Sequence, residues 1–350
     1  MKKQILLLVG MLFASTAFAN NSFWAEITPE KLQPLIQHPE VKINQKDRTG
    51  RTALMFAAQF NQKPAVVNAL IERGADINAR NFDGVTPLMY ASYSNPNPEV
   101  IESLINKGAD VNARDRAGWT SLMVASYNNP NPKIIETLIK HGADVNARNK
   151  DGVTPLMWAS LFNKNTEIIR TLIKNGALVD TRNRDGWTSL MVASYNNSNP
   201  EIIDALIKAG ADVNARNKDG ITPLRLASYN NPNPRIIETL IKWGAKVNVR
   251  RQDGVTPLME ACFNNASSEV IETLIHRGAD INMQDKYGWT PLMHACYKNR
   301  NPEVVRMLLK YGADVKMRSN AGKTALEYAR GNPYINNKKI YWEMNDLIYK

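Results

Sequence analysis

The side chains that most often carry out catalysis are few in this chain and stand apart from one another. They are His38, His141, His276, His294, Cys262 and Cys296. None of the histidines stands beside a serine or cysteine nucleophile motif, and the sequence has no Gly-rich phosphate loop, no CxxC motif and no His-rich metal motif. General acid–base catalysis needs groups within hydrogen-bond reach of the reacting proton. We therefore expect no catalytic centre, no cofactor and no metal site.

Aromatic and charged side chains offer a different chemistry, which is the binding of a partner. They recur at fixed positions of a 34-residue period. The candidate partner-binding residues are Phe56, Tyr90, Trp119, Trp158, Trp187, Tyr195, Arg225, Glu260, Trp289 and His294. Tyrosine and tryptophan are typical interface anchors, and a contiguous exposed apolar patch usually marks a partner site. We expect these side chains to contact another protein if the fold places them on one surface.

The same 34-residue period predicts the secondary-structure elements that would place these side chains on one surface. One column of glycines runs from Gly50 to Gly322 and a second from Gly74 to Gly312, both without a slip in spacing. Such a period indicates stacked supersecondary units, each of which buries its apolar face against its neighbours. The sequence therefore predicts an all-α solenoid.

Residues 81–114 show the elements expected in one repeat. Gly84 suits a tight turn, and Thr86 suits the N-cap of a first helix because a proline follows it. Asn97, also followed by proline, suits the start of a second helix, and Gly108 suits a left-handed C-cap. The repeat is therefore expected to consist of a turn, two helices joined by a loop, and an extended return.

These residues resemble the ankyrin repeat, through segments that read DGVTPLM, IIETLIK and GADVNAR. The resemblance covers eight units, at residues 47–80, 81–114, 115–148, 149–182, 183–216, 217–250, 251–284 and 285–318. It implies helix–loop–helix units with extended hairpin-like fingers, and a partner surface formed by the concave groove and the finger tips. The usual unit has 33 residues, and here one more stands in the inter-helix loop. The histidine of the family motif is replaced by Met55, Met89, Met123, Met157, Met191, Met259 and Met293, which we expect to fill the space as adaptable apolar side chains.

Both ends of the chain depart from the repeat. Lys2 and Lys3, a following apolar run and a small-x-small motif ending at Ala19 are typical of a cleavable secretory signal peptide of bacterial type, at residues 1–19. The apolar run is shorter than the roughly 20 residues of a spanning helix, which disfavours a membrane anchor. We expect a periplasmic or secreted protein with no membrane span. Residues 20–46 are expected to form an N-terminal capping half-repeat.

Residues 319–350 begin a last repeat and are expected to form a C-terminal capping repeat, with a sorting tag as the alternative for the tail. Cys262 and Cys296 are 34 residues apart and occupy equivalent positions in adjacent first helices. Packed helices lie about 8–10 Å apart, whereas a disulfide needs Cα atoms within roughly 7 Å. We therefore expect both thiols to be reduced and no disulfide to form.

The formal charge is +11, and the cations are periodic. One column contains Arg80, Arg114, Arg148, Arg182, Arg216 and Arg250, and a second contains Arg116, Lys150, Arg184, Lys218 and Lys286. Aspartates are interleaved with both columns. Two interpretations remain open: a solvated, salt-bridged edge, or a cationic ledge for an acidic partner or a polyanion. Export and the interleaved aspartates disfavour nucleic acid.

The sequence thus predicts a non-catalytic scaffold that binds a protein with some acidic surface. It favours a monomer but leaves the oligomeric state open. The alternative is a binder of an anionic polymer or envelope component through the Arg/Lys ledge. Three local questions stay open. The tyrosine column that includes Tyr195 could brace the enlarged loop instead of binding. Trp119 and Trp187 lie in identical segments, so a duplication could explain them. Arg225 and Glu260 could form an ordinary inter-repeat pair or give the groove a polar end.

Overall fold

The computed structural model describes residues 21–264, 267–336 and 338–349. The expected signal peptide, residues 1–19, lies outside these residues. Two compact units, residues 1–178 and 179–350, are described separately below. The described residues contain twenty helices and no strand, as expected for an all-α solenoid.

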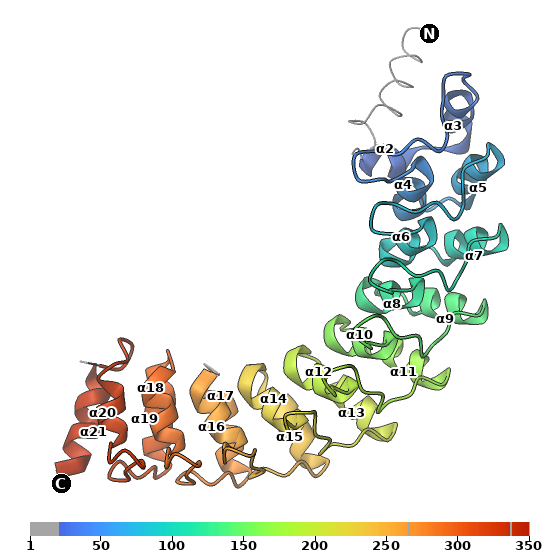
Figure 1. Ribbon diagram of the computed structural model, residues 1–350. Coiled ribbons are helices and arrows are strands. Elements are labelled where there is room, and N and C mark those ends of the chain that lie inside the picture. Colours follow the sequence, from blue (N-terminus) through green and yellow to red (C-terminus); the bar gives the residue numbers. More distant parts are fainter. Residues whose placement is uncertain (1–20, 265–266, 337, 350) are drawn as a thin grey trace. The chain divides into compact units, whose positions relative to one another are not determined.

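In the first unit the helices alternate between two rows (Figure 1). The first helices of successive repeats are α4 (Ala53–Phe60), α6 (Pro87–Ser94), α8 (Ser121–Asn128) and α10 (Pro155–Phe162). The second helices are α5 (Pro64–Glu72), α7 (Pro98–Asn106), α9 (Pro132–Lys140) and α11 (Thr166–Lys174). Within this unit each helix packs against its partner in the repeat and against the equivalent helix of a neighbouring repeat.

The second unit repeats this order. Its first helices are α12 (Ser189–Asn196), α14 (Pro223–Asn230), α16 (Pro257–Asn264), α18 (Pro291–Lys298) and α20 (Ala325–Ala329). Its second helices are α13 (Pro200–Lys208), α15 (Pro234–Lys242), α17 (Ser268–His276) and α19 (Pro302–Lys310). The final helix, α21 (Lys339–Tyr349), packs on α19 and α20 through the buried Ile340 and Met344.

The residues predicted to begin and end the helices do cap them in the structure. The Thr86 hydroxyl accepts a hydrogen bond from the Met89 N–H (3.3 Å), and the Asn97 side chain accepts one from the Glu99 N–H (3.0 Å). Gly108 ends α7 with a φ of 104°, a conformation that favours glycine. The seven methionines of the repeat motif are all buried. Seven of the eight repeats are thus filled by an unbranched apolar side chain at this position, and the repeat at residues 217–250 has Arg225 there.

The N-terminal cap contains one element more than the expected half-repeat. Besides α3 (Pro29–Ile36), which packs on α5, a short helix α2 (Asn21–Glu26) packs on α4. Trp24 of α2 is fully buried, and its ring stacks on Phe56 with centroids 6.5 Å apart. A helix of six residues is too short to show a helical period in the sequence, which is why it was not expected.

A ladder of buried asparagines in the inter-helix loops joins successive repeats, and the sequence analysis missed it. Asn129 is buried, and its Nδ2 donates to the carbonyl oxygens of Ser92 (3.1 Å) and Asn95 (3.0 Å) in the preceding repeat. Its Oδ1 accepts the N–H of Asn131 (3.1 Å). Equivalent bonds are made by Asn61, Asn95 and Asn163 in the first unit and by Asn231 and Asn332 in the second. The enlarged loop therefore holds the stack together.

Cys262 and Cys296 are both free and fully buried. Burial raises the pKa of each thiol well above its ordinary value, because the thiolate would lose its hydration. Two neutral, apolar thiols thus take the place of the Ala or Ser of the other repeats.

Candidate partner-binding face

The candidate residues lie on the surface made by the first helices and by the fingers that precede them, which we call the first-helix face. Each finger is closed by a turn: in the second repeat the Asn81 N–H donates to the Val85 carbonyl (3.1 Å), and the Asn81 side chain accepts from the Asp83 and Val85 N–H groups. Consecutive fingers are linked through the Arg116 N–H and the Asp83 carbonyl (2.8 Å). In the first unit the fingers therefore form a continuous rim beside the first helices.

On this face a finger residue stacks on a side chain 39 positions later, in the first helix of the next repeat. Trp119 stacks on Trp158, with ring centroids 4.2 Å apart. Trp289 lies 4.3 Å from Tyr328 in the same way, and the Arg51 guanidinium lies 4.3 Å from the Tyr90 ring. Trp187 packs on the cluster that contains Leu226. The tryptophans of the fingers thus pack between successive repeats. Less of their ring surface is therefore left for a partner than the sequence prediction assumed.

In the first unit the rings merge into one cluster. Tyr127 meets Trp119, Trp158 and Phe162 edge to face, at centroid distances of 5.9, 5.8 and 4.9 Å, and it stacks on Tyr93 at 6.5 Å. Within this cluster Trp119 and Trp158 are half-buried, whereas Tyr93 is 38% exposed and Phe162 is 44% exposed. The ring surface open to a partner therefore belongs mostly to Tyr93 and Phe162.

Phe56 is not available for binding, contrary to the sequence prediction. It is 3% exposed, because Trp24 covers one side and the Arg51 guanidinium lies 3.8 Å from its ring on the other. Tyr90 is half-buried, and its hydroxyl accepts a hydrogen bond from Asn81 Nδ2 (3.1 Å). Arg51 thus covers Phe56 of its own repeat and the Tyr90 ring of the next one.

In the second unit, charged groups interrupt the aromatic series. Arg225 is 1% exposed, and its Nη2 donates to Glu260 Oε1 of the next repeat. Its Nε and Nη1 have no hydrogen-bond partner among the described residues. The predicted inter-repeat pair is therefore present, but the guanidinium is satisfied by one carboxylate alone.

The next repeat carries a second polar pair. His294 Nε2 lies 3.1 Å from Asp285 Oδ2, within the finger that precedes α18, and the Trp289 ring lies 5.2 Å from His294. Burial raises the pKa of the Asp285 carboxyl, but hydrogen bonds from His294 and from the Trp289 and Tyr287 N–H groups outweigh it, so the pKa lies below its usual value. His294 is thus tied to its own finger.

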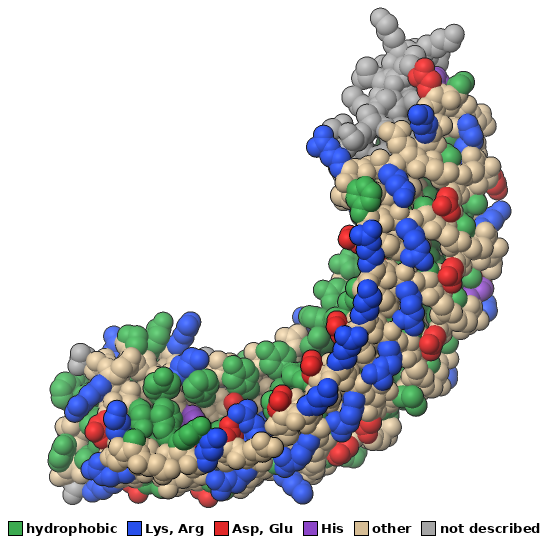
Figure 2. All heavy atoms as spheres, in the orientation of Figure 1, with side chains coloured by type: hydrophobic (Ala, Val, Ile, Leu, Met, Phe, Trp, Pro, Cys, Tyr) green, Lys and Arg blue, Asp and Glu red, His purple; other side chains and the backbone are tan. Residues whose placement is uncertain are grey.

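The two cation columns differ in their contacts. Arg80 donates to the carbonyls of Gly84 (3.2 Å) and Arg114 (2.6 Å), so it holds its own finger and the next one. The equivalent arginines Arg114, Arg182 and Arg216 also donate to finger carbonyls. In contrast, Arg116, Lys150, Arg184, Lys218 and Lys286 are exposed and form no ion pair with a described carboxylate. Figure 2 shows Lys and Arg side chains along the fingers of each unit. The first column is structural, and the second is open to solvent.

Comparison with known families decides what kind of array this is. The model of ankyrin repeats in three copies matches residues 25–115, 122–217, 190–285 and 258–340, and a model of many copies matches residues 94–139. The chain belongs to the ankyrin repeat family. No curated protein matches it. Ankyrin repeats generally mediate protein–protein interactions, and the family is typically non-catalytic.

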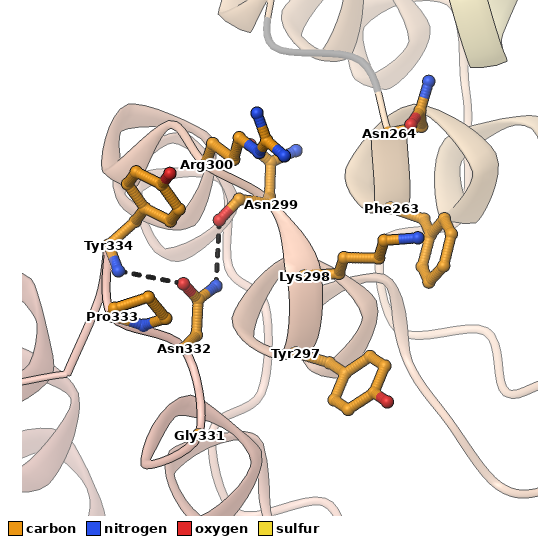
Figure 3. A pocket seen from close by; sticks show the side chains of 10 residues that line it. All are labelled: Phe263, Asn264, Tyr297, Lys298, Asn299, Arg300, Gly331, Asn332, Pro333 and Tyr334. Carbon is orange, nitrogen blue, oxygen red and sulfur yellow. Dashed lines mark hydrogen bonds between the residues drawn. The ribbon is translucent and has the colours of Figure 1, made fainter.

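Two grooves lie at the ends of first helices in this ankyrin array, beside the inter-helix loops. One, of about 570 Å³, includes Tyr127, Phe162 and Lys164. The other, of about 520 Å³, includes Tyr297, Lys298, Arg300 and Tyr334 (Figure 3). None of the residues that line these two grooves is acidic. Both grooves are lined by residues of the tyrosine column, Tyr127 in one and Tyr297 in the other, and by none of the tryptophans of the fingers.

The residues best placed for contact are thus not all those predicted. Trp119, Trp158, Trp187 and Trp289 support the face, and Tyr195 packs beside Trp187 (5.8 Å). Tyr93, Phe162 and Tyr297 were not singled out, although Phe162 stands where most repeats have asparagine or serine. That departure from the repeat pattern was the signal that could have found it.

Proposed function

We propose that this ankyrin array is a non-catalytic scaffold that binds a protein partner through the first-helix face. The observation that carries the proposal is the aromatic cluster of the first unit. Tyr93 and Phe162 leave ring surface in solvent, and both pack on Tyr127, which in turn packs edge to face on the stacked Trp119 and Trp158. Rigid aromatic side chains lose little entropy on binding and are frequent hot spots of interfaces.

The charge of the rim supports a partner with acidic surface. The exposed cations of the second column follow the face from repeat to repeat, as with Arg116 and Lys150 in the first unit. Their charge is not neutralised by described carboxylates, so an acidic partner would be steered toward the face and held at its edge. Every helix among the described residues is too short or too polar to cross a membrane.

We also propose that the protein acts outside the cytoplasm, in the periplasm or beyond, after cleavage behind Ala19. The support is the sequence of residues 1–19 alone. Mass spectrometry of the protein from a bacterial periplasmic fraction would test this. A mature N-terminus at Asn20 supports export, and an intact Met1 in the cytoplasmic fraction contradicts it.

The binding proposal is tested by capturing proteins from envelope and culture fractions with residues 20–350 as bait. The test variant combines Tyr93→Gln and Phe162→Asn, because the chain itself has Gln59 and Asn128 at the equivalent positions. We expect a partner that the wild type captures and the variant loses.

The matched control is Leu178→Asp, which removes an exposed apolar side chain elsewhere on the first unit and introduces the residue that Asp144 provides one repeat earlier. Equal capture by wild type and test variant would move the site away from the aromatic cluster. If wild type, test variant and control variant all lose the captured material at moderate salt, the result would favour an anionic polymer held by charge.

A further inference from the structure

The groove at the C-terminal end of the second unit departs from the repeat pattern at two nearby positions, the last residue of α18 and a residue of the loop that follows it. Lys298 stands where Asn128, Asn230 and Asn264 each donate to a carbonyl of the preceding repeat. Arg300 stands where Pro130 follows the ladder asparagine. The substitutions replace a structural hydrogen bond and a rigid residue by two cations, at the place where the structure has a groove.

Both cations are held on aromatic rings and lack a carboxylate partner among the described residues. Lys298 Nζ lies 4.5 Å from the centre of the Phe263 ring, and Arg300 Cζ lies 5.9 Å from the centre of the Tyr334 ring. Cation–π contact restricts the side chains but does not neutralise their charge. Two positive charges thus face one groove with no acidic lining residue.

The floor of the groove is rigid. Asn332 Nδ2 donates to the Asn299 carbonyl (2.9 Å), and its Oδ1 accepts the Tyr334 N–H (3.0 Å) (Figure 3). Its Nδ2 also donates to the Cys296 carbonyl (3.1 Å), so the amide is fully used. Tyr297 and Tyr334 expose 52% and 47% of their surface at the sides. The two cations and the exposed ring faces are therefore well placed to contact a ligand.

We propose that this groove binds an acidic peptide segment of the partner, in which a carboxylate side chain is followed by an aromatic or apolar one. The proposal rests on the proposed function and names the chemistry that one end of the array recognises. A guanidinium can hold a carboxylate in a two-pronged, charge-assisted contact, and Lys298 adds a second charge beside it. The neighbouring apolar side chain would lie on Tyr297 or Tyr334.

The test is a fluorescence titration of the mature protein with fluorescein-labelled Glu-Tyr-Glu-Tyr-Glu-Tyr, compared with Gln-Tyr-Gln-Tyr-Gln-Tyr. The groove variant, Lys298→Asn with Arg300→Pro, restores residues that the array has in equivalent loops. The control, Lys242→Gln with Lys246→Gln, removes two exposed cations from the second unit away from the groove. We expect the groove variant to raise the Kd of the acidic peptide about tenfold or more, and the control to change it less than about twofold.

Equal loss in the groove variant and the control would assign the binding to net charge and overturn the proposal. So would equal affinity for the neutral peptide, or tighter binding of hexagalacturonate than of the peptide, which would make the occupant a polysaccharide. Lys298→Gln with Arg300→Gln gives the same comparison if proline disturbs the loop. Peptide binding without any captured protein would refute the proposed function alone, and capture through the aromatic cluster without peptide binding would refute this inference alone.

Discussion

The first-helix face is built in the same way in the two units but carries different chemistry. In the first unit Trp119 stacks on Trp158, and in the second Trp289 packs on Tyr328 at nearly the same distance. The first unit then adds only rings around this stack. The second unit instead places the buried pair of Arg225 and Glu260 within its array. The comparison shows that the scaffold fixes where side chains meet, and that a few positions decide whether the surface is apolar or charged.

The buried ion pair of the second unit carries a large desolvation penalty, and this penalty indicates the role of the pair. Arg225 occupies a methionine position of the core, with two of its nitrogens unpartnered. A buried ion pair rarely stabilises a fold more than apolar residues of similar volume, because both groups lose their hydration. The pair is therefore better explained by specificity than by stability, since it ends the apolar run between repeats.

The largest expected effect comes from breaking this pair on one side. Glu260→Val introduces the residue that Val124 and Val192 provide in the same column, but it leaves Arg225 buried without a counter-charge. We expect it to lower the free energy of unfolding by about 3–5 kcal/mol. Urea denaturation followed by circular dichroism measures this.

The double variant Arg225→Met with Glu260→Val restores the motif of the first unit. We expect it to be as stable as the wild type or more stable, by up to about 4 kcal/mol. A double variant that is clearly less stable than the wild type would show that the pair stabilises the array, and the explanation by specificity would then be wrong.

The next largest effect concerns a feature that both units share. Asn129→Ala leaves the carbonyls of Ser92 and Asn95 buried without their donor. We expect a loss of about 2–3 kcal/mol, because an unsatisfied buried acceptor retains its desolvation cost. Asn231→Ala is the matched change in the second unit and should cost about the same, as judged from thermal denaturation. A large difference between the two variants would show that the ladder contributes unequally to the two units.

A smaller effect is expected from the stacked pair. Trp119→Val and Trp158→Val each introduce a residue that the chain uses at equivalent positions, as in Val85 and Val124. If the stack joins the two repeats, the double variant should lose less stability than the sum of the single variants, with a coupling of about 0.5–1.5 kcal/mol. Additive losses in a double-mutant cycle would mean that the two rings contribute separately.

The helices were predictable because each depends on residues close in the sequence. Thr86 and Asn97 cap their own helices, and Gly108 ends one, so a single repeat contains the information for its own elements. The period then predicted the alternating order of first and second helices. The asparagine ladder has the same period, yet a polar residue in a loop suggests solvent, and the analysis therefore missed that Asn129 is buried.

The candidate site was less predictable because it depends on contacts between repeats. Trp119 and Trp158 belong to different columns, and the 39-residue spacing that joins them is visible only when the columns are compared with each other. Phe56 has the same place in its repeat as Trp158, but Trp24, which lies outside the regular repeats, covers it. Side-chain exposure is thus a property of neighbours, which no single repeat specifies.

The smallest expected effect is a pH-dependent change in stability when the polar pair of Asp285 and His294 in the second unit is broken. Asp285→Asn introduces the residue that Asn81 and Asn149 have in the same turn, so the backbone hydrogen bonds are retained and the charge next to His294 is lost. Because the pKa of Asp285 is lowered in the folded protein, its carboxylate stabilises the fold above its unfolded pKa of about 4, and this is lost as the pH falls through the folded pKa. We expect the wild type to exceed the variant by about 1 kcal/mol or less at pH 7, with the difference disappearing toward pH 2. Urea midpoints of both proteins between pH 7 and pH 2 would measure this, and parallel profiles would show that the contact with His294 adds no stability, so that this end of the face is polar for recognition alone.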